Sequence, residues 1–134
     1  MIEIAGLDHI VLRTTRMDDM LHFYSDVLGC RVERALPPEF GLVQLRAGSA
    51  LIDLVAVDSA LGRAGGGPPT RGGNNMDHFC LQIVALPEEE ISRYLASHGV
   101  ETGPFERRYG AQGFGNSVYL RDPEGNVVEL RNRV

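Results

Sequence analysis

The stretch Leu7-Asp8-His9-Ile10-Val11-Leu12-Arg13 has a counterpart later in the chain, Met76-Asp77-His78-Phe79-Cys80-Leu81-Gln82. Both stretches alternate between two faces and are rich in apolar residues, which predicts β-strands. Each is followed by a helix-like stretch and then by a strand-like run with a carboxylate at its centre, Asp53 in the first half and Glu129 in the second. Two copies of one unit, each with a histidine and a carboxylate, predict a pseudo-symmetric site with a metal at its centre.

The spacing between equivalent residues supports a duplication. His9 and His78 are 69 residues apart, the pairs Leu45-Arg46 and Leu120-Arg121 are 75 apart, and Asp53 and Glu129 are 76 apart. The offset grows only where loops lie, as expected for a repeated βαβββ unit. The sequence therefore predicts one domain made of a first module (about 5–58), a Gly/Pro-rich linker (about 60–74) and a second module (about 75–134).

Helical spacing of apolar residues predicts helices over Met17–Leu28 and Pro87–His98, each followed by a glycine. The remaining strands are expected near 31–34, 42–46, 50–57, 100–106, 117–121 and 126–131. The glycine-rich run 62–73 is predicted to hold no packed element. Residues 107–116, with three glycines, are predicted to form a loop, either an ordinary one or a flexible flap over the cavity.

Composition excludes several classes of function. The chain of 134 residues carries a formal net charge of −5, contains no lysine, and has arginines spread along its length. This distribution does not indicate nucleic-acid binding. No apolar run approaches the roughly 20 residues of a membrane span, and no signal-peptide pattern opens the chain. The two cysteines belong to no motif, so a reduced, cytoplasmic setting is expected.

The titratable residues are predicted to converge on one face of the sheets. Because strand residues alternate sides, His9 lies opposite Ile10 and Leu12, and Asp53 and Glu129 lie opposite apolar neighbours that would contact the helices. Two imidazoles and a carboxylate suit a divalent transition metal with open coordination positions. The remaining candidates are weaker: His22 and His98 are expected on helix surfaces, and Cys80 is expected to be a small buried hydrophobe.

Four stretches carry a resemblance to a known family: 7–12, 23–29, Met76-Asp77-His78, and the run Tyr119-Leu120-Arg121-Asp122-Pro123-Glu124-Gly125-Asn126-Val127-Val128-Glu129-Leu130. With these, nearly the whole chain resembles the vicinal oxygen chelate superfamily. That superfamily includes glyoxalase I, bleomycin-resistance proteins, fosfomycin-resistance transferases, methylmalonyl-CoA epimerase and extradiol dioxygenases. The motifs are specific for the superfamily and not for any one activity.

The resemblance implies an α+β fold, in which two βαβββ modules form a cupped, incompletely closed mixed sheet with helices on the outer face. It implies one divalent metal ion (Zn, Ni, Mn, Co or Fe) held by His9, His78 and Glu129. Asp53 stands where the glyoxalase I pattern has glutamate, one methylene longer, and is expected to be either a fourth ligand or a general base. Tyr119 matches a substrate-binding tyrosine of the fosfomycin-resistance transferases. Short paired-module members commonly dimerise, which implies a homodimer.

The sequence thus predicts a metal-dependent glyoxalase-like enzyme, a lyase or isomerase, acting on a small oxygenated metabolite chelated to the metal. The expected step passes through a metal-stabilised enolate, with a nearby carboxylate moving the proton. Two alternatives stay open. One is an Fe(II) ring-cleaving dioxygenase, which the same ligand types would serve. The other is a non-catalytic small-molecule binding protein of the bleomycin-resistance type. Neither nucleic acid nor membrane is an expected partner.

Overall fold

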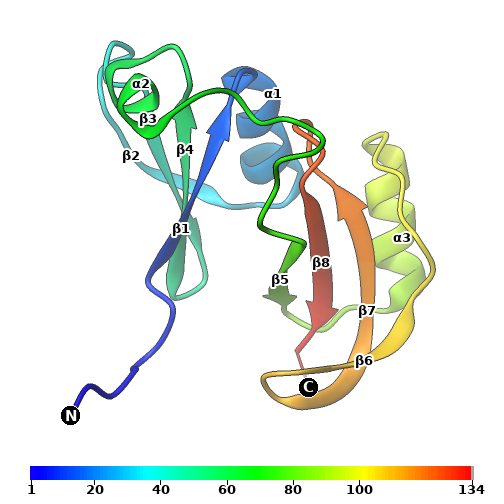
Figure 1. Ribbon diagram of the computed structural model, residues 1–134. Coiled ribbons are helices and arrows are strands. Elements are labelled where there is room, and N and C mark those ends of the chain that lie inside the picture. Colours follow the sequence, from blue (N-terminus) through cyan, green and yellow to red (C-terminus); the bar gives the residue numbers. More distant parts are fainter. Residues whose placement is uncertain (134) are drawn as a thin grey trace. The chain divides into compact units, whose positions relative to one another are not determined.

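The computed structural model describes residues 1–133, so the last residue of the predicted second module lies outside the described residues. The chain divides into two compact units, Met1–Gly73 (unit 1) and Asn74 onward (unit 2). Each unit contains its own four-stranded mixed sheet (Figure 1). The fold is therefore α+β, as predicted.

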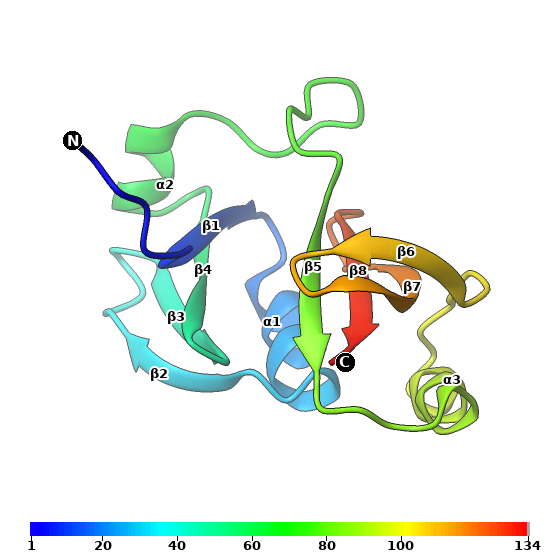
Figure 2. The ribbon, with the colours of Figure 1, turned by 90° about the horizontal axis from the view of Figure 1, so that it is seen from below.

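Unit 1 has the strand order β1-β4-β3-β2, in which β1 runs parallel to β4 and the other neighbours are antiparallel. A helical segment connects β1 to β2, and a short helix follows β4 (Figure 2). The elements are β1 (His9–Thr14), α1 (Met17–Leu21), η1 (His22–Val27), β2 (Arg31–Ala35), β3 (Leu42–Ala47), β4 (Ala50–Ala56) and α2 (Ala60–Gly65).

Unit 2 repeats this topology with the strand order β5-β8-β7-β6, and β5 runs parallel to β8. Its elements are β5 (His78–Ile83), α3 (Glu88–Ser97), β6 (Glu106–Gly110), β7 (Gly113–Arg121) and β8 (Val127–Asn132). Both units thus have the predicted βαβββ order, since the parallel pair in each sheet is closed by a crossover that begins with a helix.

The register of the parallel pair is the same in the two units. His9 lies opposite Leu51 and Val11 opposite Asp53 in β1 and β4. In β5 and β8, His78 lies opposite Val127 and Cys80 opposite Glu129. In each unit, the carboxylate therefore lies two positions after the residue that pairs with the histidine. Two positions along a strand return to the same face, so histidine and carboxylate share one face of each sheet.

The opposite faces carry the apolar core. Ile52 and Leu54 of β4 and Val128 and Leu130 of β8 alternate with the carboxylates and are buried. The helices supply further large buried side chains, which are Met20, Phe23, Tyr24, Val27, Ile91 and Leu95. The predicted helix over 17–28 is present, but its second half is a π-helix. The bond from Leu28 N–H to the Phe23 carbonyl (3.0 Å) spans five residues and widens this turn.

The prediction of a loop over 107–116 is wrong. Strands β6 and β7 form a hairpin there, with Tyr109 opposite Phe114 and the two rings 5.1 Å apart. Buried Arg131 supports it by donating hydrogen bonds to the carbonyls of Arg108 and Gly113. These contacts come from distant residues, so local glycine content was misleading. The segment is thus a hairpin and not an irregular loop, and the strand expected near 100–106 is reduced to a single bridge between Thr102 and Leu120.

The run predicted to hold no packed element begins with helix α2. Ser59 starts this helix by accepting a hydrogen bond from Gly62 N–H at 3.1 Å. A Cβ atom at Gly62 would lie 1.9 Å from the carbonyl oxygen of Ala56. Glycine therefore lets α2 pack directly on the end of β4, which explains the glycine at this position of the helix. None of the helices in residues 1–133 is long and apolar enough to cross a membrane.

Candidate metal and substrate site

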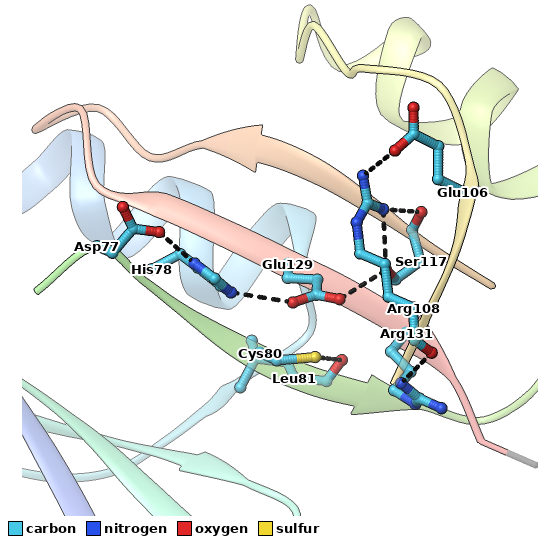
Figure 3. A network of polar contacts seen from close by, with 9 residues as sticks. All are labelled: Asp77, His78, Cys80, Leu81, Glu106, Arg108, Ser117, Glu129 and Arg131. Atoms are coloured by element: carbon cyan, nitrogen blue, oxygen red, sulfur yellow. Dashed lines mark hydrogen bonds and ion pairs between the residues drawn. The ribbon is translucent and has the colours of Figure 1, made fainter. Parts of the chain in front are cut away.

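The central contact of unit 2 joins His78 and Glu129. The Nε2 atom of His78 lies 3.2 Å from Oε2 of Glu129, whose side chain is only 8% exposed. Strands β5 and β8 are neighbours, and the shared register described above brings the two side chains to one face. Figure 3 shows the imidazole and the carboxylate pointing toward each other along that face.

The other nitrogen of His78 is also occupied, because Nδ1 lies 2.6 Å from Oδ2 of Asp77. Both ring nitrogens therefore face a carboxylate oxygen. A neutral imidazole has one N–H, and it can satisfy only one of these two acceptors. With that proton on Nδ1, Nε2 presents its lone pair toward Oε2 of Glu129, where a metal ion would be bound by both atoms. This arrangement of donors fits a metal ligand whose remaining nitrogen is oriented by a carboxylate.

Two residues that sequence reasoning missed hold Glu129 from its other side. Ser117 donates a hydrogen bond from Oγ to Oε1 of Glu129 at 2.6 Å. Arg108 in turn donates from Nη1 to Ser117 Oγ at 3.0 Å and to the Ser117 carbonyl at 2.8 Å. The alternation of side chains along a strand was the one signal available in the sequence. Ser117 lies two residues from Tyr119 and therefore shares its face of β7.

Tyr119 and Cys80 lie beside this pair. The Tyr119 ring contacts the His78 ring edge-on at 5.2 Å between centroids. The guanidinium of Arg108 lies 4.2 Å from the centre of the same tyrosine ring. Burial, reinforced by the charge of Glu129, raises the pKa of the Cys80 thiol to about 11. Cys80 is nevertheless exposed, so the expectation of a buried cysteine is wrong.

Unit 1 repeats the aspartate–histidine arrangement. The Nδ1 atom of His9 lies 2.6 Å from Oδ1 of Asp8, the residue before it. This hydrogen bond is the main reason that the pKa of His9 is raised; the charges of Asp53 and Asp8 add to it, and partial desolvation opposes it. Asp53 therefore lies close enough to act electrostatically on the imidazole. Each unit thus carries a histidine with an aspartate at Nδ1 and a second carboxylate on the same face.

Asp53 differs from Glu129 in how its oxygens are used. Its side chain is buried, with 4% of the residue exposed. Oδ2 accepts a hydrogen bond from Gln44 Nε2 at 3.1 Å, whereas Oδ1 is buried without a hydrogen-bond partner. Buried carboxylate oxygens are nearly always satisfied. An unpaired one on the face shared with His9 indicates that a donor or a cation belongs beside it.

The predicted ligand set draws on both units, with His9 from unit 1 and His78 and Glu129 from unit 2. Within residues 1–133, no cluster of three or more His, Cys, Asp or Glu residues that could hold a metal is found. The imidazole and carboxylate groups of each unit are ligand types that suit a divalent metal. Each imidazole is also oriented by an aspartate at Nδ1. The other histidines lie apart: His22 pairs with Asp26 at 3.0 Å on the surface, and His98 packs against Tyr94.

Comparison with known proteins identifies the family. A model of the Glyoxalase/Bleomycin resistance protein/Dioxygenase superfamily matches residues 6–130. The chain belongs to this superfamily, which confirms the resemblance seen in its motifs. A virulence protein of Salmonella typhimurium is 28% identical over 133 residues, covering 98% of this chain and 86% of that protein.

Solved structures agree with this assignment. Lactoylglutathione lyase from Agrobacterium tumefaciens is 26% identical with a TM-score of 0.70, covering 97% of this chain and 95% of that one. An integron cassette protein from the mobile metagenome of V. cholerae has a TM-score of 0.75 at 24% identity, covering 100% of this chain and 99% of that one. The second likeness shows the fold alone.

Proposed function

We propose that this protein is a metal-dependent glyoxalase-like enzyme, a lyase or isomerase that acts on a small oxygenated metabolite. The observation that supports it best is the environment of His78, where Nδ1 faces Asp77 and Nε2 faces Glu129. This pattern is the one expected when a carboxylate orients a metal-binding imidazole. The equivalent pair of Asp8 and His9 in unit 1 gives independent support.

His9, His78 and Glu129 are the proposed ligands of one divalent metal ion. When bound, such an ion polarises a substrate carbonyl and stabilises the negative charge that develops on its oxygen. Asp77 keeps the His78 ring in the tautomer that presents Nε2, and Asp8 does the same for His9. Tyr119, which lies against His78 and under Arg108, is proposed to contact the substrate.

Asp53 is the proposed proton carrier of the reaction. Gln44 holds one of its oxygens, while Oδ1 is unpaired and so is available to accept a proton from the substrate. A general base must reach the proton it removes within hydrogen-bonding distance. Oδ1 of Asp53 is an unpaired carboxylate oxygen on the face that carries His9, so it is free to make such a contact.

Elemental analysis of protein purified without chelator tests this proposal. We expect one divalent metal ion per chain, followed by turnover in a panel of glyoxalase, thiol-transfer and ring-cleavage assays with each metal restored. O₂ uptake with catechols in the Fe(II) form would favour the dioxygenase alternative. Protein that binds no divalent metal would contradict the proposal and favour a small-molecule binding protein.

We further propose that the protein is a homodimer in a reducing, cytoplasmic setting. Apolar side chains before β1 are largely exposed, with Ile2 at 89%, Ile4 at 82% and Leu7 at 72%, and such residues favour association. Both cysteines are free thiols, which supports the reducing setting. Light scattering should give twice the chain mass of 14.7 kDa. A concentration-independent mass of one chain would rule the dimer out.

A further inference from the structure

We infer that Ser117 and Arg108 are positioning residues that orient Glu129 for metal binding. The inference rests on the proposed function, since it concerns the same carboxylate. Its basis is a continuous set of hydrogen bonds that crosses the sheet from β6 through β7 to β8, as Figure 3 shows. The metal ion is expected to bind between Glu129 and His78.

The direction of these hydrogen bonds follows from the chemistry of arginine. A guanidinium has only donors, so Ser117 Oγ must accept from Arg108 Nη1. The hydroxyl has one proton of its own, and the remaining acceptor beside it is Oε1 of Glu129 at 2.6 Å. Arg108 thus forces the serine proton toward the carboxylate. Arg108 is itself held by Glu106, at 2.9 Å from Nη2.

The consequence for Glu129 is a fixed carboxylate plane. Ser117 is completely buried, and its hydrogen bond occupies Oε1, which leaves Oε2 toward His78. Without the hydroxyl, a buried oxygen loses its donor, and the carboxylate is free to rotate. Partners that orient a metal ligand typically change metal affinity by about 10–100-fold when removed.

Unit 1 contains a parallel arrangement around Asp53. Arg34 donates from Nη1 to Oε1 of Gln44 at 3.1 Å, and Gln44 then donates from Nε2 to Oδ2 of Asp53 at 3.1 Å. Here too an arginine occupies the acceptor of the intermediate residue and turns its donor toward the carboxylate. The same arrangement, built from different residue types in the two units, favours a positioning role over an accident of packing.

Binding of Co²⁺ alone tests the inference without knowledge of the substrate. Ser117→Ala should lower Co²⁺ affinity about 10–100-fold and change the visible absorption spectrum of the bound ion. Ser97→Ala is the matched control, because Ser97 lies exposed on helix α3 and its hydroxyl donates to the Tyr94 carbonyl. This control should bind Co²⁺ with the affinity of the unchanged protein. Thermal unfolding of the metal-free proteins separates a loss of stability from a loss of affinity.

Arg108→Met keeps the test decisive if Ser117→Ala does not fold, because the Arg108 side chain is 20% exposed. Its affinity should fall in the same direction, and Arg108→Lys should restore part of it. If both Ser117→Ala and Arg108→Met bound Co²⁺ with unchanged affinity and spectrum, the inference alone would be overturned. A failure of the unchanged protein to bind Co²⁺ would overturn the proposed function and the inference together.

Discussion

Replacement of His78 by alanine is expected to abolish metal binding while the protein stays folded. The substitution removes one of the proposed ligands and leaves Glu129 without the partner at Oε2. The imidazole is 32% exposed and faces away from the apolar core, so the free energy of unfolding should fall by about 1–3 kcal/mol, the cost of leaving a buried acceptor without its partner. Elemental analysis and circular dichroism measure the two effects, and His9→Ala should behave in the same way.

His22→Ala is the matched control for both variants. His22 pairs with Asp26 on the exposed side of its helix, and its loss should leave metal content unchanged. If His9→Ala and His78→Ala each kept one metal ion per chain, the ligand assignment would be wrong. If His22→Ala also lost the metal, the losses would have to be assigned to the fold and not to the site.

Asp53→Asn is expected to retain the metal and to lose about 10²–10⁴-fold in turnover, the range typical of removing a general base. The amide has nearly the same shape and can still pair with Gln44, so the fold should tolerate it. Aspartate reaches about 1.3 Å less far than glutamate, the projection of one C–C bond, whereas direct coordination needs roughly 2.0–2.2 Å. In a site shaped for glutamate, Asp53 would therefore stay outside the metal's coordination sphere.

Two measurements on this variant separate the possible roles: metal content, and turnover on whichever substrate the assay panel identifies. Loss of the metal would show that Asp53 is a ligand. Unchanged metal content together with unchanged turnover would leave Asp53 without a role in the chemistry. Asp26→Asn serves as the control, because this exposed carboxylate pairs with surface His22, and its replacement should alter neither quantity.

Much of the fold was predictable because it depends on patterns local in the chain. Alternation along β1, β4, β5 and β8 placed each histidine and its carboxylate on one face, as the register of the strands confirms. The repeat predicted the order of elements in both units, and the motifs identified the superfamily. The errors fell in glycine-rich segments. There, β6 and the start of β7 pair with each other, and α2 packs on β4 through Gly62.

The candidate site was likewise predictable in part. Periodicity by itself determined which titratable residues share a face, because side chains on a strand alternate with a period of two whatever the rest of the chain does. Which oxygen of each carboxylate is held was decided only by the tertiary structure. Pairing between strands brings Ser117 to Glu129 and Gln44 to Asp53. Oδ1 of Asp53 stays unpaired. Register and side-chain reach across strands are non-local, so no pattern along one strand contains them.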